Sequence, residues 1–234
     1  MAKTNKLAES AKINGKHLLF PTTLYEMQLD PKHLERMKAR ILDWRDNDDH
    51  WKSQEDPVIW VSNDDLYKHK DFKDFGDYVM GMGDTILKDW AIDTSYNGDG
   101  AARNIKRTPD HNCYITGMWA NISRRHYQHQ VHNHPNCTIS GIVYLSAPEG
   151  SGMTYFNDPR DVRQVFQPDY YGMKHENAYQ FMSEPKVGKV VMWPSWLKHS
   201  VGPNMISKDE ERISLAFNLH FHGRAQRITQ RLVW

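Results

Sequence analysis

Three histidines and one arginine are the residues of this sequence best suited to chemistry. His132 and His134 are two positions apart. Residues so spaced in an extended chain point to the same face, so the two imidazoles could hold one metal ion. Pro135 follows directly and favours an extended backbone at position 134. His199 lies far along the chain after an expected strand end and turn, and with Arg212 on a later segment the order indicates a metal site beside an anion site.

Arg212 begins a segment in which side chains alternate strictly between apolar and other types. One face would carry Ile213, Leu215, Phe217 and Leu219, and the other Arg212, Ser214, Ala216 and Asn218. A guanidinium among apolar strands needs an anionic partner, and its fork matches a carboxylate. The Ser214 hydroxyl, on the same face, could donate to that carboxylate. The alternative is a buried ion pair with Glu210, Glu211 or another acid.

The segment that follows the histidine pair can be counted in the same way. One face would carry Asn136, Thr138, Ser140, Ile142 and Tyr144, and the other Cys137, Ile139, Val143 and Leu145. A strand with one largely polar and one apolar face would line a cavity and pack against a core. We therefore expect Tyr144 in the cavity, unless Pro135 or Gly141 carries a bulge that shifts the register. Asn121, on the preceding expected strand, is a further candidate for the cavity.

Short apolar runs separated by turns fill the chain from about residue 104 to its end. We expect strands at 113–122, 137–145, 153–156, 189–193 and 213–221. Strands at this spacing are typical of a β-sandwich or barrel. The segment 159–183 has little apolar periodicity and many Tyr, Gln and Asp residues, so we expect a long insertion or lid there.

Residues 1–103 are expected to be helical or irregular and to pack on the sheet. Asp30 and Pro31 suit the cap and first turn of a helix. Its apolar stripe would be Leu34, Met37, Ile41 and Trp44, and that of a second helix over 72–90 would be Phe75, Val79, Met82, Ile86 and Trp90. Gly81 and Gly83 weaken the middle of the second helix. The 234 residues suit a single domain.

Composition excludes several classes of protein. With 39% hydrophobic and 25% charged residues the chain resembles ordinary globular proteins, and its net charge of +1 gives no field that would attract nucleic acid or a membrane. The first ten residues lack the apolar core of a signal peptide, and no run approaches the ~18 apolar residues of a membrane span. We expect a cytoplasmic protein in which Cys113 and Cys137 are reduced.

Four segments together resemble the 2-oxoglutarate-dependent Fe(II) oxygenases, and most closely a small bacterial and phage subgroup related to prolyl hydroxylases. These segments are HNHP at 132–135, SGIVYL at 140–145, PSWLKH at 194–199 and ERISLAFN at 211–218. The resemblance covers about residues 112–221. Each segment alone is unspecific, whereas their combination in this order is specific.

The resemblance implies a mainly β fold, a double-stranded β-helix of the jelly-roll or cupin-like type, with N-terminal helices packed on it. It implies Fe(II) held at the mouth by the histidine pair and His199, and 2-oxoglutarate with its far carboxylate on Arg212. Ser214 and Tyr144 would complete that clamp, and Asn121 could bond the metal-bound end. The implied enzyme is a hydroxylase or related oxygenase that converts 2-oxoglutarate to succinate and oxidises a C–H bond of a small-molecule or peptidyl substrate, with ascorbate as an accessory reductant.

One position departs from the family's usual pattern of two histidines and one carboxylate. His134 stands where the carboxylate is expected, which would raise the charge of the iron centre by one. Three ligand sets stay open: all three histidines; His132 and His199 with water or Asp158; or His134 as the proximal ligand with Asn136 in the acid's place. Two other functions also fit, a cupin-like three-histidine dioxygenase or isomerase without 2-oxoglutarate, and a non-catalytic barrel that binds a small acid or a partner protein.

Overall fold

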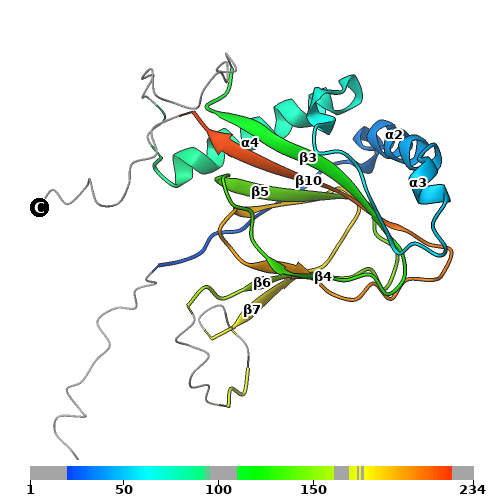
Figure 1. Cartoon of the computed structure of the whole chain (residues 1–234). Helices are drawn as coiled ribbons and strands as arrows, with labels where there is room; N and C mark the ends of the chain where they lie inside the picture. The colour runs from blue at the N-terminus through cyan, green and yellow to red at the C-terminus, as the bar shows by residue number, and fades with distance from the viewer. Residues whose placement is uncertain are drawn as a thin grey trace, which may run out of the picture.

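The computed structural model describes residues 20–92, 94, 110–160, 169–172, 174 and 177–222. In this part of the chain two antiparallel β-sheets face each other, and helices cover the far side of the larger sheet (Figure 1). The larger sheet has the order β1 (Tyr25–Gln28), β8 (Lys189–Pro194), β5 (Ile139–Ser146), β10 (Arg212–Phe221), β3 (Cys113–Ser123) and β2 (Ile59–Val61). The smaller sheet has the order β4 (His129–His132), β9 (His199–Val201), β6 (Thr154–Asn157) and β7 (Gln180–Ser183). Two facing antiparallel sheets are the predicted jelly-roll arrangement.

The alternation predicted for the two central strands is confirmed. On β10 and β5 the predicted apolar faces lie in the large core between the sheet and the helices. Their other faces turn toward the smaller sheet, where Ile142 and Tyr144 pack in a second apolar cluster with Phe156 and Trp193. Gly141 carries no bulge, because β5 stays in register with both neighbours there, and a Cβ at Gly141 would lie 2.3 Å from the Phe217 ring. The bare backbone of Gly141 therefore makes room for a core aromatic.

The predicted helices are present. The first begins as a 3₁₀ turn, η1 (Pro31–His33), capped by Asp30, and continues as α2 (Glu35–Asp46) and the short α3 (Asp49–Lys52). Two 3₁₀ turns, η2 (Leu66–Lys68) and η3 (Lys70–Phe72), lead into α4 (Lys73–Asp89). Helix α4 runs unbroken through Gly81 and Gly83. It lies close to the sheet there, since a Cβ at Gly83 would be 2.7 Å from the Cys113 sulfur. None of the described helices is long and apolar enough to cross a membrane.

Five short strands were not predicted, namely β1, β2, β4, β7 and β9. Each has only three or four residues, too few to show a period of two against the background. One of them, β7, forms the end of the segment 159–183 and pairs with β6. Residues 161–168, 173 and 175–176 of that expected lid lie outside the described residues. Cys113 and Cys137 are both free thiols, as predicted.

Candidate metal centre and co-substrate pocket

The three predicted histidines converge at one end of the smaller sheet. His132 is the last residue of β4, His199 is the first residue of β9, and the two pair directly across the sheet. His134 lies in the connection from β4 to β5. One ring nitrogen from each of the three histidines can be chosen so that all lie within 4.8 Å of one another. Within the described residues, this is the only group of histidine, cysteine or acidic side chains so arranged.

The route by which His132 and His134 meet differs from the prediction. We expected both on the strand that continues to Tyr144, but that strand begins only at Ile139, and His132 belongs to the other sheet. In the connection from β4 to β5, Asn136 has a left-handed backbone with φ of 63°. This conformation turns the chain from one sheet into the other, which an asparagine tolerates better than most residues. The histidine pair is therefore a bridge between the sheets, and Tyr144 reaches the cavity from its own strand.

Each of the three imidazoles has its Nδ1 atom hydrogen-bonded to an oxygen. The Nδ1 of His132 lies 2.8 Å from the Gln130 carbonyl oxygen, and that of His199 lies 2.9 Å from the Leu197 carbonyl oxygen. The Nδ1 of His134 lies 2.6 Å from Oδ1 of Asn218. Because a carbonyl oxygen can only accept, Nδ1 carries the proton and the lone pair of each ring is on Nε2. Histidines that bind metals are commonly fixed in this way.

Burial keeps the rings of His134 and His199 in the neutral form that a metal requires. Burial lowers the pKa of His199 to about 3, an effect that its bond to the Leu197 carbonyl opposes. Burial also lowers the pKa of His134, against the opposing effect of its bond to Asn218. A neutral imidazole offers its lone pair at neutral pH without first losing a proton. The cluster is therefore ready to bind a cation.

Arg212 is the second notable group, since it is a buried cation with free hydrogen-bonding capacity. Its side chain comes from the first residue of β10, is 2% exposed, and lies over the Tyr144 ring at 5.0 Å. Its Nη1 donates to Oγ of Ser214 at 3.2 Å, whereas Nε and Nη2 are buried and have no partner. No carboxylate of the described residues pairs with it. Two free N–H groups on one guanidinium fit an incoming carboxylate.

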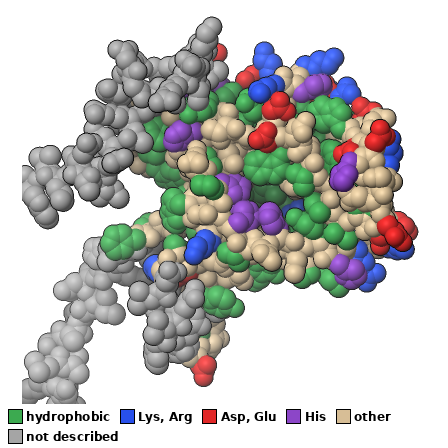
Figure 2. Space-filling view, in the orientation of Figure 1, with side chains coloured by type: hydrophobic (Ala, Val, Ile, Leu, Met, Phe, Trp, Pro, Cys, Tyr) green, Lys and Arg blue, Asp and Glu red, His purple; other side chains and the backbone are tan. Residues whose placement is uncertain are grey.

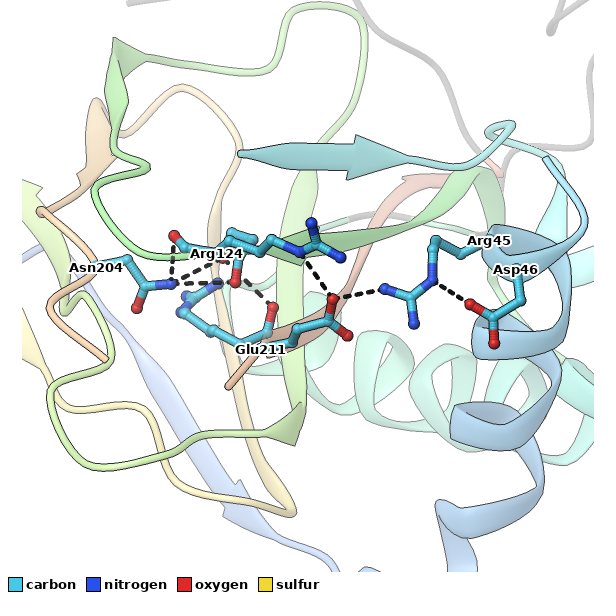
Figure 3. Close-up of polar contacts among 7 residues, drawn as sticks. Arg45, Asp46, Arg124, Asn204 and Glu211 are labelled. Atoms are coloured by element: carbon cyan, nitrogen blue, oxygen red, sulfur yellow. Dashed lines mark hydrogen bonds and ion pairs between the residues drawn. The ribbon is translucent and has the colours of Figure 1, made fainter. Parts of the chain in front are cut away.

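The expected alternative, an ion pair of Arg212 with a neighbouring acid, is wrong for its two nearest candidates. Oε1 of Glu211 lies 2.6 Å from Arg45 of α2 and 3.1 Å from Arg124, which follows β3 (Figure 3). Glu210 accepts from the backbone of Ser207. The Glu211 bridge ties α2 and the end of β3 to the residue just before Arg212, so it anchors the start of β10.

Tyr144 and Asn121, both predicted for this pocket, lie beside Ser214 in the larger sheet. Ser214 pairs with Tyr144 on one side and with Asn121 on the other. The fully buried Tyr144 shares a hydrogen bond of 2.8 Å with the hydroxyl of Thr154, a residue of the smaller sheet. The side chain of Asn121 is half-buried and makes no hydrogen bond with the described residues. Tyr144 and Ser214 thus contact the guanidinium, and Asn121 lies across from Ser214 on the neighbouring strand.

The two other candidates for the third ligand position lie elsewhere. Asp158 binds Arg160 through both carboxylate oxygens, at 2.8 and 2.7 Å. Asn136 is exposed in its left-handed turn. Neither contributes to the cluster of three histidines.

Several residues near the site were missed by the sequence reasoning. Tyr127 lies close enough to Arg212 for that charge to oppose the rise that burial gives its pKa. His129 stacks on His132 with ring centres 4.2 Å apart, and Trp193 meets His199 edge to face at 4.8 Å. Trp193 directly precedes the Pro-Ser-Trp-Leu-Lys-His segment, so its neighbours in sequence were a usable signal. No pattern marked Tyr127, because it lies in a turn.

The site opens to solvent on the face drawn in Figure 2, where histidine side chains gather at the edge of a hollow and hydrophobic side chains form much of its border. His132 and His134 are half-buried, whereas His199 is only 4% exposed. Trp119 of β3 lies near this opening, with its ring 5.7 Å from that of His134. The cluster is thus accessible from one side and enclosed on the other.

Comparisons with known proteins agree with this geometry. A family model described as a putative 2OG-Fe(II) oxygenase matches residues 117–218, a span that begins in β3 and ends in β10. The matched part of this chain thus resembles the 2-oxoglutarate- and Fe(II)-dependent oxygenases. The chain has no match among curated proteins.

Solved structures confirm the predicted double-stranded β-helix fold of this chain. The α-ketoglutarate-dependent epimerase SnoN of nogalamycin biosynthesis aligns with 86% of this chain and 78% of its own, at 11% identity and a TM-score of 0.59. A prolyl-4-hydroxylase from Pseudomonas putida aligns with 88% of this chain and 96% of its own, at 12% identity and a TM-score of 0.52. HygX from Streptomyces hygroscopicus, with nickel and 2-oxoglutarate bound, aligns over 85% and 82%, at 11% identity and a TM-score of 0.52.

The residues of this site fit iron and 2-oxoglutarate. The three Nε2 lone pairs could hold one iron ion and would leave it open positions for the co-substrate and oxygen. The buried guanidinium, with two free donors, fits the carboxylate of an acid such as 2-oxoglutarate. Imidazole nitrogens suit iron, and also zinc, copper and nickel, so the histidines alone do not select the metal.

Proposed function

We propose that this chain is a 2-oxoglutarate-dependent oxygenase, a hydroxylase whose iron is bound by His132, His134 and His199 and whose 2-oxoglutarate is bound by Arg212. The observation that carries the proposal is that two incomplete binding groups border the same cluster between the two sheets: three imidazoles that offer Nε2, and a buried cation without an anion among the described residues. Bound Fe(II) would supply the oxygen chemistry that couples decarboxylation of 2-oxoglutarate to oxidation of a C–H bond. The protein's part is to place the reactants.

The far carboxylate of 2-oxoglutarate would bind at the closed end of the pocket. Arg212 would donate from Nε and Nη2, and Ser214 would support the guanidinium from the side. If Thr154 donates to the Tyr144 oxygen, the Tyr144 hydroxyl proton is free to reach the same carboxylate. Asn121, whose side chain has no described partner, would bond the co-substrate from β3. These contacts would orient the keto-acid end toward the histidines.

The all-histidine set changes the charge of the site. Three neutral imidazoles would leave the full +2 charge of iron in a pocket that also holds the Arg212 cation. In the usual set one carboxylate ligand removes one unit of that charge. A dianionic co-substrate would therefore compensate a larger part of the positive charge here, which favours its binding.

A small-molecule or peptidyl substrate is the class that we propose, entering past the half-buried Trp119 and the β2 edge. The similar structures include a prolyl-4-hydroxylase and HygX with hygromycin B bound, so the fold admits either kind in those proteins. The net charge of +1 gives no reason to propose nucleic acid. We further propose that residues 1–234 form one domain, that 159–183 serves as a lid over the opening, and that the protein is cytoplasmic.

The direct test combines spectroscopy with product analysis. Fe(II) and 2-oxoglutarate added without oxygen should give the weak visible charge-transfer band of the chelated co-substrate. Admission of oxygen, with ascorbate present, should then yield succinate even without the substrate. His132→Ala and His199→Ala should remove both signals, while His129→Ala, which loses only a stacked ring outside the cluster, should keep them.

Two outcomes would count against the proposal. Absence of both the band and succinate in the wild-type protein would refute 2-oxoglutarate chemistry. Tight metal binding that 2-oxoglutarate neither changes nor strengthens would instead favour the three-histidine enzyme in which Arg212 holds a carboxylate of the substrate.

A further inference from the structure

The bond that fixes His134 differs in kind from those that fix the other two histidines. His132 and His199 donate to backbone carbonyls of residues two positions earlier, so the bonds depend on local chain geometry alone. His134 donates to the side chain of Asn218, a residue of β10 that is 84 positions away. Oγ of Ser140 also lies near this Nδ1, at 3.0 Å, but Asn218 Oδ1 is closer, at 2.6 Å, and can only accept. The orientation of His134, and the location of its proton, thus depend on side chains of distant segments that a substitution can remove.

Asn218 is held in place by a buried polar network. Its Oδ1 accepts from Nδ1 of His134 at 2.6 Å and from the hydroxyl of Ser140 at 2.8 Å, which uses both of its lone pairs. Ser140 also lies 2.9 Å from the hydroxyl of Ser195, and the Ser195 carbonyl accepts from the backbone N–H of His134. Ser140 and Ser195 are fully buried. Three separate segments therefore fix the position of a single imidazole.

The backbone around Asn218 is adapted to this contact. Strand β10 stays in register with β5, where Asn218 faces Ser140, but β3 contains one extra residue at this point. Asn218 pairs with Gly117 and Leu219 pairs with Ile115, so Thr116 is unpaired in a bulge. Bulges change the direction of a side chain and are frequent next to active sites. Here the bulge lies directly opposite the residue that binds His134.

We propose that Asn218 is the positioning residue that sets the tautomer of His134 and thereby lets a histidine act where the family uses a carboxylate. This inference rests on the proposed function, because it assumes that His134 is an iron ligand. The Oδ1 atom keeps the proton on Nδ1 and leaves Nε2 free to bind the metal. Without an acceptor at Nδ1, an imidazole favours the proton on Nε2, where it would block the metal. A neutral amide also fixes the tautomer without restoring the negative charge that the site lacks.

The test uses two variants at this position and a matched control. Asn218→Leu keeps the size of the side chain and removes Oδ1, so the hydroxyl of Ser140, 3.0 Å from Nδ1 of His134, becomes free to donate to that nitrogen. Asn218→Asp keeps the acceptor and adds a negative charge. Asn157→Leu makes the same change as the first variant on β6, where the asparagine bonds Gln180 rather than a histidine. The first readout is the tautomer of His134 in the metal-free protein, measured by long-range ¹H–¹⁵N correlation of the imidazole. The second is the affinity for Co(II) and Fe(II).

In the wild-type protein, in Asn218→Asp and in Asn157→Leu we expect the Nδ1–H form of His134. In Asn218→Leu we expect the Nε2–H form, with metal affinity lower by roughly 10- to 100-fold. Asn218→Asp should bind metal more tightly than wild type, since a carboxylate on Nδ1 makes the ring a stronger ligand. This variant keeps the inference testable if Asn218→Leu does not fold.

An Nδ1–H form and wild-type metal affinity in a folded Asn218→Leu would overturn the role of Asn218, as would an affinity for Asn218→Asp equal to or below that of wild type. These results are distinct from failure of the proposed function. In that case wild-type protein would give no 2-oxoglutarate band, whereas the tautomer of the metal-free protein would still respond to Asn218→Leu.

Discussion

Replacement of Arg212 by methionine should have opposite effects on ligand binding and on stability. Methionine keeps much of the length of the side chain and removes the charge. A bidentate contact between the free Nε and Nη2 groups and a carboxylate comprises two charge-assisted hydrogen bonds. At about 1.5–3 kcal/mol each, their loss amounts to roughly 3–6 kcal/mol. That is a loss of roughly 10²- to 10⁴-fold in affinity for 2-oxoglutarate.

The same substitution should increase the stability of the protein without bound 2-oxoglutarate. Free Arg212 is buried with two unsatisfied N–H groups and no anionic partner among the described residues. Removing a buried, unpaired charge should raise the free energy of unfolding by about 1–3 kcal/mol. For a chain of this length each kcal/mol corresponds to a rise of roughly 2–4 °C in Tm.

The assay measures Tm and calorimetric affinity with Ni(II) in place of iron, with and without 2-oxoglutarate. Wild-type protein should gain stability from saturating 2-oxoglutarate, by about 2.7 kcal/mol at a hundred times Kd. Arg212→Met should start from a higher Tm and gain little. A lower starting Tm would mean that the arginine has a structural ion pair. An affinity within threefold of wild type would mean that the co-substrate binds elsewhere; either result would refute the reasoning.

Two further predictions concern the ligand set and the helix that covers the sheet. His134→Asp exchanges a neutral ligand for an anionic one, so the variant should still bind Fe(II), and its charge-transfer band with 2-oxoglutarate should move to longer wavelength. A band at the wild-type wavelength would show that His134 is not a metal ligand. Gly83→Ala places a Cβ 2.7 Å from the sulfur of Cys113, so overpacking of about 1–3 kcal/mol should outweigh the gain in helix propensity and lower Tm. In Gly81→Ala the new Cβ would meet only His111, at 3.7 Å, so this change should raise the free energy of unfolding by about 0.5–1 kcal/mol. Equal effects of the two changes on Tm would show that packing against the sheet does not determine the stability of α4 variants.

Local periodicity was sufficient for much of the frame and for part of the site. The faces of the two long central strands followed from alternation alone, because a strand of eight or ten residues repeats its pattern several times. The same alternation put Arg212, Ser214 and Tyr144 on the inner face. The need of a buried guanidinium for an anion is a property of the side chain itself, so the sequence determined both where this cation lies and which kind of partner it lacks.

Only the tertiary structure decided how the three histidines meet and which nitrogen each one offers. His132 ends β4 and His134 lies two residues on, in the connection to the other sheet, and the turn at Asn136 in this connection has no periodic signal. The pairing of His132 with His199 joins two strands of three or four residues that are separated by more than sixty positions. The acceptor for His134 comes from Asn218, farther along still. Spacing in a sequence shows which residues share a face, whereas contacts across sheets follow from long-range packing, which no local pattern records.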